Sequence, residues 1–222
     1  MSLILKNNVE KYNRIYKEGH NHKYPNLNLV RIFNTYFLKK AGKLLDFGFG
    51  TGENSIFLSN SGYKVYSLEA SREAINIIKK KNTLLKKKLR VFHFINSKKI
   101  PFKSNFFDVV LCSSVISLLG NKKNIQDLVN EFSRILKKGG HLVIDINGPK
   151  GGFFKNAIVK KKNHTFYVLK KKQNSKIKVF HCKSVKDFLI FFKKFEIKDV
   201  GEIYYKYLDI CDHEFLAILK KK

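Results

Sequence analysis

The feature that most constrains this chain is a glycine-rich turn between a short apolar run and a helical pattern. The apolar run Leu44–Leu45 ends at an acid, Asp46, and three glycines follow at alternate positions, Gly48, Gly50 and Gly52. A strand that stops in such a turn at a helix N-terminus lets a ligand lie directly against backbone N–H groups. The turn therefore predicts a ligand site at the end of a strand.

The glycine spacing separates this turn from the dinucleotide-binding type. That type reads G-x-G-x-x-G and needs a small residue where this chain has Glu53. Residues 46–52 read D-x-G-x-G-x-G instead. Glu53, together with the lack of a recognisable second domain in the sequence, argues against a nicotinamide-dependent dehydrogenase.

Strand-like and helix-like segments alternate after the turn. We predict helices at 54–60, from 71 onward and at 122–137, and strands at 63–69, 91–95, 107–112 and 141–146. We expect Gly139–Gly140 to end the third helix. This order is typical of a parallel, doubly wound α/β sheet. The last part of the chain departs from it, with a β-rich excursion at 164–181, a helix from Ser184 to 195, and closing strands at 202–208 and 214–219.

Composition narrows the class of protein and raises a question about charge. The chain has 222 residues, is 44% hydrophobic and carries a net charge of +28, with 45 Lys and Arg against 17 Asp and Glu. Only five residues are Arg, whereas nucleic-acid readers favour Arg for bidentate contacts. Lysine codons are rich in A and T, so an AT-rich genome alone raises the lysine content of a protein. This explains the total charge at least as well as nucleic-acid binding does.

The distribution of the lysines is more informative than their number. No Asp or Glu occurs from Ile146 to Lys186. The lysines of that stretch are Lys150, Lys155, Lys160, Lys161, Lys162, Lys170, Lys171, Lys172, Lys176, Lys178, Lys183 and Lys186. The stretch is either a solvated basic excursion or a positive wall that attracts an anionic substrate.

Other classes of protein find no support in the sequence. The three cysteines are odd in number and widely spaced, which predicts neither a disulfide framework nor a metal site. No apolar run approaches the ~20 residues of a membrane span, and the N-terminal apolar stretch is too short for a signal peptide. We therefore expect a cytoplasmic protein.

The glycine turn resembles the first motif of the class I S-adenosylmethionine-dependent methyltransferases, a Rossmann-like family. Further segments between Leu44 and Asn147 follow the family's order, among them Ile100-Pro101-Phe102, Phe107-Asp108-Val109-Val110 and the helix–Gly-Gly–strand segment 136–144. The resemblance is to small-molecule enzymes of the methyltransferase domain 11 and 25 kind. It implies a three-layer α/β/α fold with a seven-stranded, mostly parallel sheet whose last strand is antiparallel.

The resemblance also implies an organisation and a cofactor, S-adenosyl-L-methionine. We expect a single methyltransferase domain over residues 1–222. Its parts are an N-terminal helical cap at 1–43, a cofactor-binding core at 44–147, a basic lid or insertion at 148–183, and a C-terminal helix with closing strands at 184–222.

Ligands of open α/β sheets bind outside the carboxyl ends of the strands, and the resemblance places the cofactor contacts there. The implied cofactor-binding residues are Asp46, Gly48, Phe49, Gly50, Glu69, Ala70, Asn96, Ser97 and Ser113. The Glu69 carboxylate offers two acceptor oxygens for the ribose hydroxyls. Asn96 stands where the family usually has Asp, and it keeps an acceptor for the adenine amine.

The catalytic residues are less defined. A neutral nucleophile needs a base when it is methylated, and the candidates are His20, His22 and Asp145, with His164 and His181 as further histidines. Each histidine is equally explained by a surface or packing role. The chain lacks the Pro-Pro-aromatic motif of exocyclic-amine methylases, a Pro-Cys pair for cytosine C5 chemistry, and clustered cysteines for radical chemistry.

We therefore expect a methyltransferase that acts on an oxygen or nitrogen of a small, anionic metabolite, such as a phosphorylated or glycan precursor. Two alternatives remain open at this point. One is a tRNA or rRNA methyltransferase. The other is a catalytically silent module that binds S-adenosylmethionine.

Overall fold

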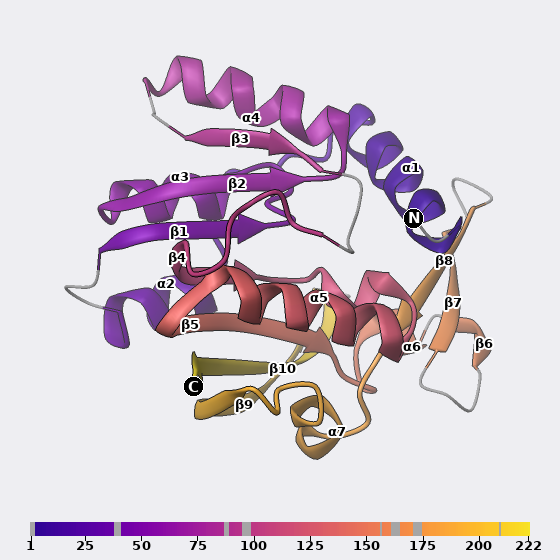
Figure 1. The fold of residues 1–222 in the computed structure, drawn as a ribbon. Coiled ribbons are helices and arrows are strands. Elements are labelled where there is room, and N and C mark those ends of the chain that lie inside the picture. Colours follow the sequence, from indigo (N-terminus) through magenta and orange to yellow (C-terminus); the bar gives the residue numbers. More distant parts are fainter. Residues whose placement is uncertain are drawn as a thin grey trace.

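A seven-stranded sheet organises the molecule, and its strand order is β3-β2-β1-β4-β5-β10-β9 (Figure 1). The computed structural model describes residues 3–37, 41–86, 89–94, 99–155, 157–160, 165–170, 175–208 and 210–222. The strands of this sheet are β1 Gly42–Phe47, β2 Tyr63–Glu69, β3 Arg90–His93, β4 Phe107–Cys112, β5 Leu136–Asn147, β9 Phe195–Tyr207 and β10 Ile210–Lys221.

Strand directions confirm the predicted fold class. β1 pairs in parallel with β2 and β4, β2 with β3, and β4 with β5. β10 is antiparallel to both β5 and β9. The sheet is thus Rossmann-like and mostly parallel, with an antiparallel last strand. We call the end at which β1 to β5 finish the carboxyl edge.

Helices cover both faces of the sheet. They are α1 Leu3–Lys17, α2 Leu27–Thr35, α3 Glu53–Asn60, α4 Arg72–Leu84, α5 Lys122–Ile135, α6 Gly152–Lys155 and α7 Val185–Leu189, with a 3-10 turn at Ile116–Leu119. Apolar residues of α5 and α7 form one core with one face of the sheet. Those of α2, α3 and α4 form a second core with the opposite face. Together they make the predicted three layers, with α5 in front of the sheet in Figure 1.

Polar side chains fix where several helices begin. The side chains that accept a backbone N–H at a helix N-terminus are Asn26 for α2, Ser71 for α4, Asn121 for α5 and Ser184 for α7. Such a cap satisfies a donor that the helix itself cannot pair. Two of these caps, Ser71 and Ser184, lie where the sequence predicts helices to begin.

The predicted boundary between α5 and β5 is wrong. α5 ends at Ile135, and β5 already begins at Leu136, which pairs with Phe107 and is fully buried. The two glycines therefore lie inside the strand, where Gly139 has a φ of +74° and a Cβ at Gly140 would lie 2.9 Å from the Lys137 carbonyl oxygen. Pairing with β4 overrides the helical pattern in this segment.

The C-terminal elements also differ in length from the prediction. α7 ends at Leu189, and Phe191, Phe192 and Phe195 reach the core from a turn and the start of β9. β9 and β10 are both longer than the predicted strands at 202–208 and 214–219. Their cross-strand pairing extends each one beyond its locally apolar part.

A second, smaller sheet and α1 lie at the carboxyl edge of the central sheet (Figure 1). This sheet, in the order β6-β7-β8, consists of β6 Ala157–Lys160, β7 Thr165–Lys170 and β8 Ser175–Phe180. β7 and β8 lie within the predicted β-rich excursion at 164–181, whereas β6 precedes it. The Asn8 side chain of α1 donates to the carbonyl oxygens of Leu118 at 2.6 Å and Lys178 at 3.2 Å. Helix α1 therefore connects the segment after β4 to β8 of the smaller sheet. None of the helices in the described ranges has the length and apolarity that crossing a membrane requires.

Phe132 tests the core that joins α5 to the sheet. Its side chain is fully buried, and its ring packs edge-on against Phe47 at 5.2 Å between centroids. Phe132→Ala should lower the free energy of unfolding by about 3–5 kcal/mol, because a large cavity replaces the ring. Urea unfolding measures this, with the exposed Lys123→Ala on the same helix as control. A loss for Phe132→Ala no larger than that of the control would contradict the assignment.

Candidate functional site

The glycine turn follows β1 directly and needs glycine for its shape. Gly48, Gly50 and Gly52 have φ values of +74°, +61° and +89°, a region that residues with a Cβ rarely adopt. A Cβ at Gly48 would overlap the side chain of Val115, and one at Gly52 would overlap Ile78. The turn therefore packs against both the segment after β4 and helix α4.

Asp46 stabilises the residues beneath this turn through hydrogen bonds. Its buried carboxylate accepts a 2.6 Å hydrogen bond from the Ser55 hydroxyl of α3, and the Ser67 hydroxyl of β2 lies 2.8 Å from Ser55. Burial raises the pKa of Asp46 to about 7, with the charges of Glu53 and Glu69 acting in the same direction and the Ser55 hydrogen bond opposing it. Asp46 thus joins β1, β2 and α3 beneath the turn.

Glu69 lies at the end of β2 and joins three backbone segments. One carboxylate oxygen accepts N–H groups of Ala70 at 2.7 Å and Ser71 at 3.0 Å, and the other accepts the Gly50 N–H at 3.0 Å. Burial raises the pKa of Glu69, while these N–H groups oppose the shift. Three of its roughly four acceptor positions are thus in use. Binding two ribose hydroxyls at once requires Glu69 to release a backbone N–H.

Two tyrosines of α1 face the same place, and the sequence analysis did not identify them. The Tyr16 hydroxyl would lie 3.3 Å from a Cβ at Gly50, on the side of the turn that no other atom fills within 4 Å. Burial and the nearby Glu69 charge raise the pKa of Tyr12 to about 12 and shift that of Tyr16 in the same direction. Asn13, between them, accepts a 2.6 Å hydrogen bond from the Ser71 hydroxyl. The spacing of four residues between Tyr12 and Tyr16 places both side chains on one face of a helix, and this spacing could have indicated them from the sequence.

Further residues that the sequence predicts to bind the cofactor are Phe49, Ala70, Asn96 and Ser97. Phe49 is 3% exposed and packs in the core with α2, α3 and α4, so only its backbone is available to a ligand. Ala70 contributes its N–H to Glu69, and its carbonyl oxygen lies 3.0 Å from His93 Nε2. Asn96 and Ser97 lie outside the described residues.

Ser113 and Asp145 form a second polar group at the carboxyl edge. The Ser113 hydroxyl donates to one oxygen of Asp145, and the Ser114 N–H donates to the other, both at 2.6 Å. Burial raises the pKa of Asp145 to about 6, against the effect of these two donors. Ser114 has a φ of +58°, so Asp145 holds a strained residue between β4 and Val115, the neighbour of Gly48.

The histidines lie apart from these carboxylates. His20 and His22 are exposed, with Nε2 atoms 2.9 Å apart, and the His22 N–H donates to the Thr51 hydroxyl at 3.1 Å. Lys81 donates to the carbonyl oxygens of His22 and Thr51, both at 2.9 Å. Their loop is therefore attached to the glycine turn through its backbone.

Two further histidines, His181 and His164, are candidates for the base from the sequence. His181 is buried with its ring 4.8 Å from that of Phe154, and His164 lies outside the described residues. In the part of the chain that the structure describes, no three His, Cys, Asp or Glu side chains are grouped to hold a metal ion.

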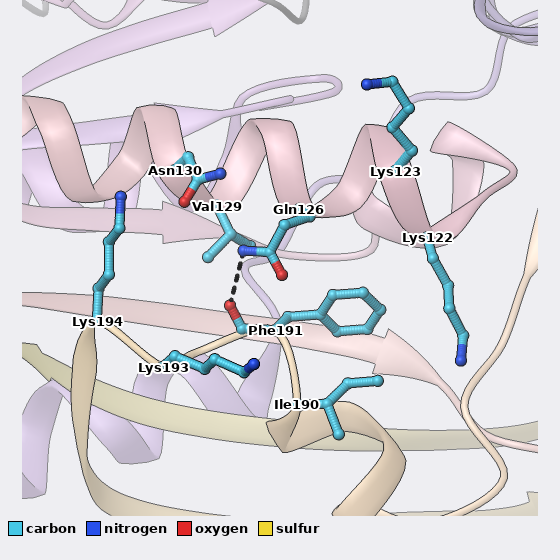
Figure 2. Close-up of a pocket in the computed structure, with 9 residues that line it drawn as sticks. All are labelled: Lys122, Lys123, Gln126, Val129, Asn130, Ile190, Phe191, Lys193 and Lys194. Carbon is cyan, nitrogen blue, oxygen red and sulfur yellow. Dashed lines mark hydrogen bonds between the residues drawn. The ribbon is translucent and has the colours of Figure 1, made fainter.

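A groove of about 710 Å³ lies elsewhere, between α5 and the segment after α7 (Figure 2). Its lining residues are Lys122, Lys123, Gln126, Val129, Asn130, Ile190, Phe191, Lys193 and Lys194. The Gln126 amide donates across it to the Phe191 carbonyl oxygen at 3.1 Å. None of the predicted site residues lines this groove.

Comparison with known proteins shows which domain family the chain resembles. Residues 45–144 match the family model described as "Methyltransferase domain". The provisionally named methyltransferase YqeM of Bacillus subtilis is 29% identical over 111 residues, which are 50% of this chain and 44% of that protein. A demethylmenaquinone methyltransferase of Tropheryma whipplei is 28% identical over 102 residues, 46% of this chain and 40% of that protein. The matches thus span less than half the length of these relatives.

Solved structures agree on the fold. A SAM-dependent methyltransferase from Methanosarcina mazei has a TM-score of 0.71 at 18% identity, covering 85% of this chain and 96% of that one. An S-adenosylmethionine-dependent methyltransferase from Clostridium acetobutylicum has a TM-score of 0.63 at 15% identity, covering 97% and 98%. With the family match, this fold identifies S-adenosylmethionine as the cofactor.

The described residues fit that cofactor. The charges of Glu53 and Glu69 both disfavour the charged form of Asp46 and so raise its pKa. S-adenosylmethionine carries a sulfonium and an ammonium group, which offset such repulsion. Glu69 also has acceptor capacity left for a ribose hydroxyl beside Gly50, where the Tyr16 hydroxyl is the one atom within 4 Å of an added Cβ among the described residues.

Gly52 tests the packing of the turn on α4. Gly52→Ala should destabilise the protein more than Gly62→Ala, because both positions have a φ near +90° but only Gly52 has Ile78 in the way. Gly62 has nothing within 4 Å of an added Cβ, so it isolates the backbone cost. Urea unfolding of both variants measures the difference. Equal losses would contradict the close packing.

Asp46 predicts a pH dependence. Because its folded pKa of about 7 lies above the ordinary carboxyl value of 3.8, the stability that it contributes is greatest at low pH and is lost as pH rises to about 7. Asp46→Asn keeps an acceptor for Ser55 and removes the charge. Relative to wild type, the variant should therefore gain stability in urea unfolding as pH rises from about 4 to about 7, with no further gain above about pH 7. Asp127→Asn on α5 is the control, and a difference independent of pH would contradict the prediction.

Proposed function

We propose that the chain, whose residues 45–144 match the methyltransferase domain family, uses S-adenosylmethionine to methylate an oxygen or nitrogen of a small, anionic metabolite. One observation carries the proposal: the Glu69 carboxylate and the glycine turn meet through the Gly50 N–H at the carboxyl edge. That contact brings a diol-binding carboxylate next to a backbone that a ligand can approach closely.

The chain's part in this reaction is alignment. S-adenosylmethionine supplies the activated methyl group when it is bound. Glu69 would hold the ribose, and the backbone at Gly48 and Gly50 would hold the methionine portion. Ser113 and Ser114, fixed by Asp145, would form the wall between the cofactor and the acceptor. Fixing both reactants in line lowers the entropic part of the barrier.

Two observations support the class of acceptor. The acid-free stretch from Ile146 to Lys186 begins where β5 reaches the carboxyl edge, so its first residues lie beside the proposed reaction site. Of these, Lys150 and Lys155 fold back onto the β9–β10 hairpin, with Lys150 bonded to Glu202 at 2.7 Å. The Tropheryma whipplei relative is named for demethylmenaquinone, which is a small molecule.

An isotope-transfer screen tests the proposal. S-adenosylmethionine with a labelled methyl group is offered in parallel to a metabolite extract and to total RNA. We expect label in small molecules that an anion-exchange resin retains. Label in RNA alone would assign the chain to RNA methylation. Calorimetric binding of the cofactor without transfer to either pool would assign it to cofactor binding alone.

Glu69 provides the most direct test of the cofactor site. Glu69→Gln should raise the Kd for S-adenosylmethionine by about 10- to 100-fold, because a hydrogen bond to a charged group contributes about 1.5–3 kcal/mol. Isothermal calorimetry measures it. Glu73→Gln on α4 makes the same chemical change nearby and should leave the Kd unchanged. If both variants bind like wild type, Glu69 does not hold the ribose.

A further inference from the structure

Glu214 is a carboxyl group at the carboxyl edge to which the proposed function gives no role. It lies on β10 opposite Asn147 of β5, two residues from Leu216, which lies opposite Asp145. Side chains two residues apart on a strand share a face, and so do directly opposed pairs. Glu214 and Asp145 therefore point from the same face of the sheet, at the end of β5.

A continuous set of contacts joins this position to the cofactor turn. Val115 packs against Gly48, and the preceding Ser113 and Ser114 donate to the two oxygens of Asp145. Asp145 is thus held in place with both oxygens engaged. Glu214 lies one strand further along, and two strand spacings separate β4 from β10, about 10 Å. An acceptor molecule placed beside the cofactor would span that distance.

Glu214 differs from its acidic neighbours in having no hydrogen bond to its carboxylate anywhere in the described residues. On its own strand, the Asp212 carboxylate accepts the Tyr205 hydroxyl of β9 at 2.7 Å. Burial raises the pKa of Glu214 to about 8, with Asp145 and Asp212 adding to the shift. The groups that face it are therefore Asp145 from β5, Asp212 from β10 and Tyr205 from β9.

The basic groups nearby belong to the other face of β10. There His213 Nε2 lies 2.7 Å from Glu202, and Lys150 binds the same carboxylate at 2.7 Å. The Lys155 ammonium lies 3.3 Å from the Cys211 sulfur. These basic groups already contact other side chains. Among the described residues, the Glu214 carboxylate is therefore left without a lysine partner, although the chain is rich in lysine.

We propose that Glu214 is the proton acceptor for the group that is methylated, a role that rests on the proposed function. The acceptor's oxygen or nitrogen forms a bond to the methyl carbon while the carbon–sulfur bond breaks and its electron pair stays on sulfur. The acceptor's O–H or N–H proton passes to the Glu214 carboxylate, and a neutral sulfide remains. The acceptor is therefore a hydroxyl or amine that carries a dissociable proton.

This role predicts a pH profile. A base acts in its deprotonated form, so the rate should rise as pH increases through about 8 and then level off. Asp212→Asn removes a charge that holds the pKa of Glu214 up, so the midpoint of the rise should move to lower pH without loss of the plateau rate.

The test measures initial rates of label transfer from methyl-labelled S-adenosylmethionine into a metabolite extract, from about pH 6 to pH 9.5. Glu214→Gln should lower the plateau rate by about 100-fold or more and abolish the rise with pH. Its Kd for S-adenosylmethionine, measured by calorimetry, should equal that of wild type. A general loss of structure would change that Kd as well, and in that case the Asp212→Asn midpoint decides the matter.

Two results would overturn the inference alone. One is a Glu214→Gln variant that transfers label at the wild-type rate, and the other is a pH midpoint that Asp212→Asn leaves unmoved. A wild-type protein that binds the cofactor but labels nothing in the extract overturns the proposed function, and the role of Glu214 with it.

Discussion

The hydrogen bond from the Gly50 N–H to Glu69 is the contact on which the rest of the site depends. Through its other oxygen the same carboxylate holds the N–H groups of Ala70 and Ser71. One side chain therefore fixes the end of β2, the start of α4 and the glycine turn after β1. Because a ligand must compete for that carboxylate, cofactor binding and the conformation of the turn are physically linked. Burial and the charge of the same carboxylate raise the pKa of both tyrosines of α1, which extends the link to the N-terminal helix.

A second polar group connects the cofactor half of the edge to the half where an acceptor would lie. Asp145 holds Ser113 and Ser114, and these precede Val115, which packs on Gly48. A hydrogen bond to each of its two oxygens suits Asp145 to positioning rather than to proton transfer. Glu214, one strand further on, lacks such partners among the described residues and is left available for chemistry. The pairing of β10 with β5 places Asp145 and Glu214 on the same face of adjacent strands. The hydrogen-bonded Asp145 carboxylate and the Glu214 carboxylate therefore lie close to each other at this edge.

Much of the fold could be predicted from the sequence because its signals are local. The glycine turn, the capping serines and the alternation of apolar segments each reflect backbone needs within a few residues. The boundary at Leu136 could not be predicted, since pairing with Phe107 decides it and that pairing is a long-range contact. Tyr12 and Tyr16 were missed for the same reason: only the path of α1 across the carboxyl edge brings them to Glu69. The cofactor roles of Asp46, Gly48, Phe49, Gly50, Glu69, Ala70 and Ser113 stay predictions, and the structure adds what each side chain contacts.

A crystal structure of the protein with S-adenosylhomocysteine, the stable product of methyl transfer, tests the central claim most directly. The account predicts the ribose hydroxyls within hydrogen-bond distance of the Glu69 carboxylate and the amino-acid portion against the backbone of Gly48 and Gly50. It also predicts that the Glu69 carboxylate turns to release one of its backbone N–H groups. A ligand bound away from the turn, for example in the groove beside α5, or a ribose without contact to Glu69, would contradict it.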